Sequence, residues 1–371
     1  MRCQPSIAAS KQRRRAAVVQ SRSGQRGLTT AGLGSDSESR GAGTDVERRS
    51  PLTSWLNLPK PWLILAPMAG VCDWPFREVC YRFGAEVTFS HLLSAQGLVA
   101  SPKRLLPAVG ARHGDRPFVA QLFGSTPADF RAAARILTDA LPLAGIDVNM
   151  GCPAELVVKH HHGAWLLREP DLAAEIVAAT VAGTHLPVTA KVRLGWESLT
   201  VDALAPKLVQ AGARALIVHG RTREQQYHGL VSAEGIAEVR RAVDVPVVAN
   251  GDVRSVADAR RMLDVTGADG LMVGRGAVGN PWLFASLQAE LKGERGYLGT
   301  ELGVADLMRW HVRLAFEDQP GLAHLTVRKH LISYSRGHPG SAALRRATAG
   351  LRCRADFDAW IAGYESSRAA A

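Results

Sequence analysis

The sequence predicts an α/β fold: a (β/α)8 TIM barrel followed by a small C-terminal helical domain. Eight short apolar runs, many of them rich in β-branched residues, recur between positions 63 and 276, and segments with helical spacing separate most of them. Eight strands that alternate with helices are typical of this barrel. A doubly wound open sheet is the competing fold, but it would be expected to carry GxGxxG after the first strand, where this chain has APMAG.

Each element is expected at a defined place in the chain. The strands are expected at 63–68, 87–90, 118–123, 146–150, 188–194, 215–220, 247–252 and 271–276. Helices are expected between them at 129–141, 171–182, 201–211, 233–242 and 256–263. The strand pattern then stops, and helices are expected at 302–316, 323–335 and 341–364. The barrel therefore occupies 56–300 and the helical domain 301–371.

Residues 1–55 differ in composition from the rest of the chain. They are rich in Arg, Ser and Gly and contain no acidic residue before Asp36. Such a segment cannot bury enough apolar surface to fold alone, so we expect a disordered basic extension. Its composition is equally that of an organelle transit peptide, of an upstream start-codon artefact and of a basic tail that touches RNA.

Composition and charge restrict the class of protein. A hydrophobic fraction of 46% and a charged fraction of 21% are typical of a globular protein. The formal charge of +11 favours polyanionic partners, nucleic acid before a membrane surface. The five cysteines are scattered without CxxC pairs, which argues against a disulfide framework or a zinc site. The same cysteine pattern indicates a reducing compartment, so we expect a cytoplasmic protein, and we expect it to be a monomer. No apolar run approaches the roughly 18 residues of a membrane span.

Polar and reactive residues gather at the C-terminal end of each expected strand. In a barrel these ends meet on one face, where such enzymes keep their active sites, so the pattern predicts catalysis. The residues are Pro67 and Met68, Ser90, Gln121, Asn149 to Cys152, Lys191 and Arg193, His219 to Arg223, Asn250 to Asp252, and Gly274 with Arg275.

Cys152 is the first candidate for chemistry, because it lies between Gly151 and Pro153 directly after an apolar strand. Gly and Pro shape the backbone there, so the thiol is displayed rather than packed in an apolar period. The adjacent run 160–162 consists of three histidines. Consecutive side chains point in different directions and lack a patterned Cys or carboxylate partner, so we expect no metal site.

Two strand ends late in the barrel suit a phosphate group. Gly251 and Gly274 let backbone N–H groups approach an anion, and Arg275 adds a charge-assisted contact. Gln121 and Lys191 offer an amide and a cation, which suit the pyrimidine-like edge and the N1 region of a flavin. His219 could contact a flavin phosphate or a substrate, and Arg221 with Arg223 form an anion or nucleic-acid grip.

Together these motifs resemble the tRNA-dihydrouridine synthase family. The resemblance extends from about residue 64 to 287 and continues more weakly through Arg328-Lys329-His330 to Gly340, a segment that leans towards the bacterial B-type enzymes. The motifs are LAPMAGVCDWPFR (65–77), VAQLFGSTP (119–127), DVNMGCPAELV (147–157), GAWLL (163–167), KVRLGW (191–196), VHGRTREQ (218–225), VANGDV (248–253) and VGRGAVGNPW (273–282).

The resemblance implies an FMN-binding barrel and a helical tRNA-binding domain. Family members reduce uridines in tRNA to 5,6-dihydrouridine, and NADPH restores the flavin. Hydride reaches C6 from the flavin, and Cys152 takes the position of the acid that protonates C5; an ordinary thiol is mostly protonated at neutral pH. The FMN contacts implied are Pro67, Met68, Ala69, Gln121, Lys191, His219, Asn250, Gly251, Asp252, Gly274 and Arg275. Asn149, Arg193, Arg221 and Arg223 are expected to hold the extruded nucleotide.

Two positions depart from the family pattern. Cys72 stands where members usually have a hydroxyl residue, and His91 where they often have an acid. Two other functions stay open at this point: an FMN barrel that acts on a small molecule, and an RNA-binding protein on a barrel without activity. The basic charge and the C-terminal helices argue against the first. The complete set of flavin and proton-donor residues argues against the second.

Overall fold

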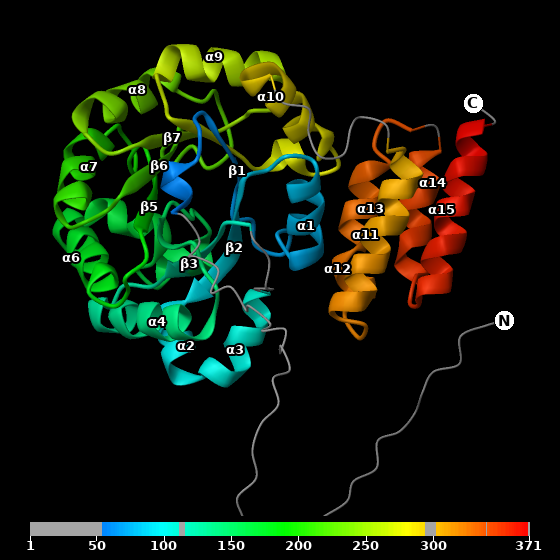
Figure 1. Ribbon diagram of the computed structural model, residues 1–371, viewed down its shortest axis with the longest axis horizontal. Coiled ribbons are helices and arrows are strands. Elements are labelled where there is room, and N and C mark those ends of the chain that lie inside the picture. The colour runs from blue at the N-terminus through cyan, green and yellow to red at the C-terminus, as the bar shows by residue number, and fades with distance from the viewer. Residues whose placement is uncertain (1–53, 111–115, 294–301, 339, 370–371) are drawn as a thin grey trace, which may run out of the picture. The chain divides into compact units, whose positions relative to one another are not determined.

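Eight parallel strands close into a barrel, and each strand pairs with the next along the chain until β8 pairs with β1 (Figure 1). The computed structural model describes residues 54–110, 116–293, 302–338 and 340–369. The strands are β1 (Trp62–Leu65), β2 (Val87–Ser94), β3 (Phe118–Phe123), β4 (Gly145–Met150), β5 (Val188–Arg193), β6 (Ala215–His219), β7 (Val247–Asn250) and β8 (Gly270–Val273). The predicted barrel fold is confirmed, with each strand close to its expected place.

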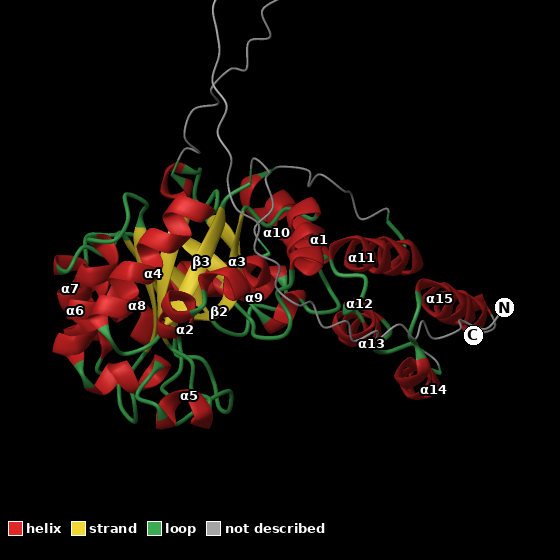
Figure 2. Cartoon of the chain, turned by 90° about the horizontal axis from the view of Figure 1, so that it is seen from below, coloured by secondary structure: helices red, strands yellow, loops and turns green. Residues whose placement is uncertain are grey.

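The helices of the barrel surround the strands, apart from the short α5 (Glu155–Lys159), which lies below them in Figure 2. The others are α1 (Trp74–Arg82), α2 (Ala95–Ala100), α3 (Pro102–Val109), α4 (Pro127–Ala140), α6 (Pro170–Val181), α7 (Val201–Gln210), α8 (Ala233–Ala242), α9 (Val256–Thr266) and α10 (Trp282–Lys292). Capping side chains and proline explain where several of these helices begin. Asp73, Ser232 and Ser255 accept a backbone N–H in the first turn of α1, α8 and α9, and Pro127 begins α4.

A separate apolar cluster fills the interior of the barrel. It includes Trp55, Trp62, Ile64, Phe89 and Met272, and the rings of Trp55 and Trp62 meet edge to face at 5.0 Å. Trp55 is fully buried, so the folded part already includes the end of the predicted extension 1–55. Average composition does not indicate this burial, because it hides a single large apolar side chain. The rest of the extension lies outside the described residues.

The chain after the barrel forms α11 (Val304–Asp318), α12 (Ala323–Thr326), α13 (Arg328–Tyr334), α14 (Ser341–Ala347) and α15 (Arg354–Ala369). Two of the three expected helices are interrupted. Leu351 is extended after Gly350, and the carboxylate of Asp356 accepts the N–H groups of Arg352 and Cys353, which starts α15 anew. The break at Val327 is slight, because its backbone keeps helical angles.

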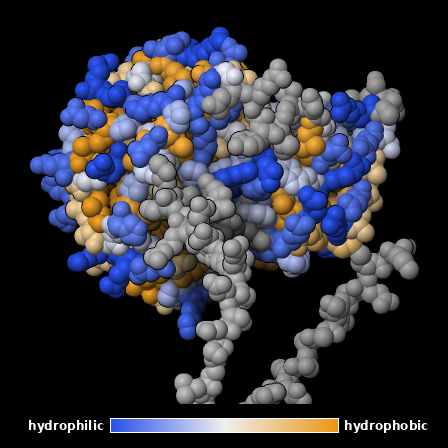
Figure 3. Space-filling model, in the orientation of Figure 1, coloured by the Kyte–Doolittle hydropathy of each residue, from blue (hydrophilic) through white to orange (hydrophobic). Residues whose placement is uncertain are grey.

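The C-terminal helices pack on α1 and continue the core of the barrel. The Phe76 ring stacks on His330 with centroids 4.6 Å apart, and Phe76, His311 and His330 are all fully buried. Hydrophilic side chains cover much of both parts on the face in Figure 3. None of the described helices combines the length and apolarity needed to cross a membrane.

Candidate active site at the carboxyl ends of the strands

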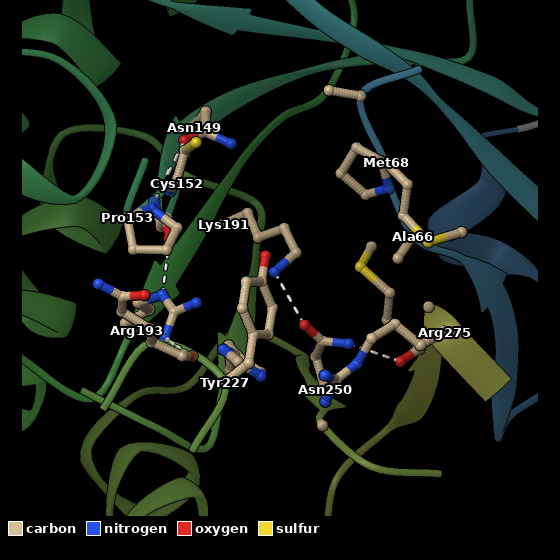
Figure 4. A pocket seen from close by; sticks show the side chains of 18 of the residues that line it. Ala66, Met68, Asn149, Cys152, Pro153, Lys191, Arg193, Tyr227, Asn250 and Arg275 are labelled. Carbon is tan, nitrogen blue, oxygen red and sulfur yellow. Dashed lines mark hydrogen bonds between the residues drawn. The ribbon is translucent and has the colours of Figure 1, made fainter. Parts of the chain in front are cut away.

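A cavity of about 590 Å³ opens where the strands end, and it gathers most of the predicted site residues (Figure 4). Its size is that of an ordinary small-molecule or cofactor site. The predicted residues that line it are Pro67, Met68, Ala69, Asn149, Cys152, Lys191, Arg193, His219, Asn250, Gly251, Asp252, Gly274 and Arg275. Gln121, Arg221 and Arg223 do not belong to the lining.

The backbone around Cys152 is fixed from two sides. Asn149 Oδ1 accepts the N–H groups of Gly151 at 3.3 Å and Cys152 at 3.0 Å. On the other side Gly163 has φ +62°, and a Cβ there would lie 2.9 Å from the Cys152 carbonyl oxygen. Only glycine fits this close approach. These contacts fix the backbone of Cys152. Its side chain is partly exposed and lines the cavity.

Asn149 is held by a buried chain of polar side chains. Asn149 Nδ2 donates to Gln121 Oε1 at 2.9 Å, and Gln121 Nε2 donates to Asp147 Oδ2 at 2.7 Å. Thr189 donates to the other oxygen of Asp147 at 2.6 Å. Burial raises the pKa of Asp147 to about 7. Both functional atoms of Gln121 are thus engaged inside the protein, and the structure places it behind Asn149 rather than on the cavity wall.

A lysine and an asparagine meet on the cavity wall formed by β5 and β7. Lys191 Nζ donates to Asn250 Oδ1 at 2.9 Å, and Asn250 Nδ2 donates to the Met272 carbonyl at 2.7 Å. Burial, with Arg193 nearby, lowers the pKa of Lys191 to about 8. Burial and four neighbouring cations lower the pKa of His219, so its imidazole is neutral at physiological pH.

The strand ends of β7 and β8 form a narrow turn region with three glycines. A Cβ at Gly276 would lie 2.1 Å from the Val253 carbonyl, and one at Gly251, where φ is +136°, would lie 2.8 Å from Val231. Arg275 pairs with Asp252 at 2.9 Å, and half of its side chain is exposed. The exposed half of the Arg275 side chain, beside these glycines, suits contact with an anion.

Two of the arginines predicted to hold a nucleotide are buried and bonded to backbone carbonyls. Arg193 donates to Gly151, Thr222 and Gln226 at 2.7 to 2.9 Å. Arg221 donates to Gly229 at 2.6 Å and pairs with Asp252. Each is 2% exposed, so their placement does not support direct contact with a nucleotide backbone. Both guanidinium groups bind loop carbonyls that only the folded backbone brings within reach, so residue type alone cannot indicate these partners.

Arg223 lies outside the cavity and stacks on an aromatic ring. Its guanidinium carbon is 4.7 Å from the centre of the Trp196 ring, and Arg168 lies over the same ring at 5.2 Å. The side chain is 19% exposed, more than those of Arg193 and Arg221. Of the three predicted arginines, only Arg223 keeps a surface that an RNA could reach beside the cavity.

Several lining residues were not predicted from the sequence. Tyr227 is the most prominent, since it is 53% exposed and its ring faces Arg193 and Arg275. The others include Leu92, Glu155, Gln226, Arg254 and Met272. An aromatic residue between charged and glycine residues in REQQYHG was the available signal for Tyr227.

Cys72, which departs from the family pattern in the loop after the first strand, does not line the cavity. It is 1% exposed, its sulfur donates to the Ala66 carbonyl at 3.0 Å, and burial raises its pKa to about 12. Among the cysteines of the described part of the chain, Cys152 is the one that lines the cavity.

Known proteins are similar to this chain over most of its length. The family model for dihydrouridine synthase (Dus) matches residues 64–360. The tRNA-dihydrouridine synthase B of Proteus vulgaris is 40% identical over 297 residues, which cover 78% of this chain and 90% of that protein. The tRNA-dihydrouridine synthase B of Escherichia coli (strain K12) is 38% identical over 293 residues, 76% of this chain and 89% of that protein. The chain therefore belongs to the dihydrouridine synthase family.

Proposed function

We propose that this protein reduces specific uridines in tRNA to 5,6-dihydrouridine, with FMN as cofactor, NADPH as reductant and Cys152 as the acid. The observation that carries the proposal is that the thiol of Cys152 lines the same cavity as the bonded pair of Lys191 and Asn250. The relatives named tRNA-dihydrouridine synthase B support assignment to the B-type subfamily.

The residues present fit FMN. Ala66, Met68 and Met272 give the cavity apolar walls for a planar ring system. Lys191 is a cation placed to stabilise a reduced flavin, and neutral His219 can donate or accept a single hydrogen bond. The glycine-rich ends of β7 and β8 with Arg275 would hold the phosphate. Pro67, Ala69, Gly251, Asp252 and Gly274 complete the proposed contacts, while Gln121 acts through Asn149.

Reduction of the uracil C5–C6 bond needs a hydride and a proton on neighbouring carbons. FMN, when bound and reduced, supplies the hydride. Cys152 supplies the proton at C5, and Asn149 fixes the backbone from which the thiol projects. A thiol on a wall of the same cavity can act as a general acid without changing the fold around it.

The proposed tRNA partner matches the charge of the C-terminal helices. Their exposed arginines are Arg313, Arg336, Arg345, Arg346, Arg352, Arg354 and Arg368. These residues can contact RNA phosphates without sequence readout, in keeping with the formal charge of +11. A base stacked inside tRNA must be extruded to reach Cys152, and such a surface would hold the RNA while this happens.

The test compares two cysteine variants. We expect Cys152→Ala to keep FMN, seen in the visible absorbance of the purified protein, and its melting temperature. Formation of dihydrouridine on tRNA that lacks the modification should fall roughly 100- to 10,000-fold, because the acid is lost. Cys72→Ser is the matched control, since a hydroxyl can still donate to the Ala66 carbonyl. Full activity of Cys152→Ala would refute the proposal.

A further inference from the structure

Tyr227 presents an aromatic ring to the cavity from the loop between β6 and α8. Its side chain is 53% exposed and lines the cavity. The guanidinium carbons of Arg193 and Arg275 lie 5.4 and 4.9 Å from the ring centre, and His219 lies 6.3 Å away. Figure 4 shows the ring between the side of the cavity that holds Arg193 and the side that holds Asn250. Such exposure is unusual for a large ring that is merely part of a core.

The loop holds Tyr227 rigidly, although its side chain faces solvent. Arg193 Nη1 bonds to the carbonyls on the N-terminal side of the tyrosine, those of Thr222 at 2.9 Å and Gln226 at 2.8 Å. Arg221 bonds to the carbonyls on the C-terminal side, those of His228 at 3.1 Å and Gly229 at 2.6 Å. Buried charged groups thus fix the backbone both before and after Tyr227.

The residue just before Tyr227 has a strained backbone. Gln226 has φ +49°, in the left-handed region that non-glycine residues rarely adopt. Strain of this kind persists where surrounding contacts enforce it, and it gathers at binding sites. Here the contact that enforces it is the bond from Arg193 to the Gln226 carbonyl.

Contacts with the arginines do not by themselves account for the exposed ring. Arg193 is bonded to three carbonyls, and Arg275 is paired with Asp252. Both cations therefore have stronger partners than an aromatic face, which contributes little at an exposed site. A fixed and exposed ring on a cavity wall instead suits a planar ligand, since stacking loses little side-chain entropy when the ring is already ordered.

We infer that Tyr227 is a positioning residue whose ring stacks on the extruded uracil and holds it for protonation by Cys152. The inference rests on the proposed function, because the cavity must receive a base of tRNA. Arg193 and Arg221 then serve the nucleotide indirectly, since they hold the loop that carries the ring. Stacking on an aromatic side chain needs only the flat face that every base has, so the ring would hold the base without reading its hydrogen-bonding edge.

The test uses the full-length, FMN-loaded protein with unmodified tRNA. We expect Tyr227→Ala to lower the rate of dihydrouridine formation roughly ten- to hundredfold, the loss typical of one base–aromatic stack. Tyr227→Phe should restore most of the rate, because the ring and not the hydroxyl is needed. Leu230→Ala is the matched control, since Leu230 is 89% exposed on the same loop but does not line the cavity.

Two further readouts separate stacking on the base from other roles. Flavin content, melting temperature and the rate of flavin reduction by NADPH without tRNA should be unchanged in Tyr227→Ala. If Tyr227→Ala lost flavin, or if NADPH reduced its flavin more slowly without tRNA, the ring would serve the cofactor and the inference would be overturned. Wild-type activity of Tyr227→Ala would overturn it too, while leaving the proposed function intact. A wild-type protein that forms no dihydrouridine would overturn both.

Discussion

Lys191 and Asn250 are joined across the barrel mouth by a 2.9 Å hydrogen bond from Nζ to Oδ1, although β6 lies between their strands. The amide of Asn250 cannot turn without loss, because its Nδ2 donates to the Met272 carbonyl at 2.7 Å. The oxygen therefore faces the lysine. This contact fixes a cation in the cavity with a neutral partner, so its charge stays available to a ligand.

The first prediction concerns the pH dependence of activity. Because the pKa of Lys191 is about 8, the amine is charged below that pH and neutral above it. We expect the single-turnover rate to fall as pH rises through about 8. Asn250→Asp places a carboxylate beside the amine and raises its pKa, so the midpoint of this fall should move up by about one unit or more. An unchanged midpoint would argue against a role for the lysine charge.

The second prediction concerns the buried polar chain behind Cys152. Asp147→Ala leaves the donors of Gln121 and Thr189 without an acceptor, which should cost about 2 to 3 kcal/mol of unfolding free energy. The loop of Cys152 loses support, so turnover should fall as well. Asp147→Asn is the control, because its amide oxygen can still accept from Gln121 and the Thr189 hydroxyl can turn to accept. Chemical denaturation gives the stability.

The same pair of variants tests the ionisation of Asp147. Its pKa is raised to about 7 from an ordinary value near 3.8, so the folded protein binds more protons than the unfolded chain between these values. Stability from this group is therefore greatest at low pH and declines as pH rises from about 4 to about 7. Asp147→Asn has no such ionisation, so its stability relative to wild type should improve between pH 5 and pH 8. A constant difference would contradict the raised pKa.

The third prediction concerns acid sensitivity where α11 packs on α1. Burial lowers the pKa of His311 to about 3, so the unfolded chain binds more protons than the folded protein between pH 6.5 and about 3. Stability should be lost as pH falls below 6.5, by about 1 kcal/mol between pH 7 and 5.5 from this residue. His311→Gln should flatten that slope, whereas His228→Gln, an exposed histidine, should not. The denaturation midpoints of wild type and both variants, measured at several pH values, test this expectation.

The fourth prediction concerns the contact of the β8–α10 loop with α13. Gly279 has φ +81°, and a Cβ there would lie 2.5 Å from the Ser333 carbonyl. Gly279→Ala must displace α13 or the loop, so dihydrouridine formation should fall more than flavin content. Gly293→Ala is the control, because Gly293 has φ +69° but no atom within 4 Å of the added carbon. Gly293→Ala should lower the free energy of unfolding by only roughly 1 to 2 kcal/mol, the cost of placing alanine in the left-handed backbone region.

The sequence alone was enough to place the strands and most of the cavity wall. Short runs of alternating or continuous apolar residues predict strands locally. A parallel barrel then places the C-terminal ends of all its strands on one face. Cys152, Lys191, His219 and Asn250 follow from that rule, because each sits at or just after a strand end. Their convergence on one face can be predicted without knowing their side-chain contacts.

Only the tertiary structure decided what the polar side chains of the loops do. Gln121 lies near the end of its strand, as Lys191 does, yet its side chain turns to Asp147 and Asn149. Arg193 and Arg221 bind carbonyls of the loop that carries Tyr227, a residue that no strand end indicates. The physical reason is that backbone pairing along the strands repeats and is set locally, whereas a long polar side chain takes whichever partner the folded loops bring within about 3 Å.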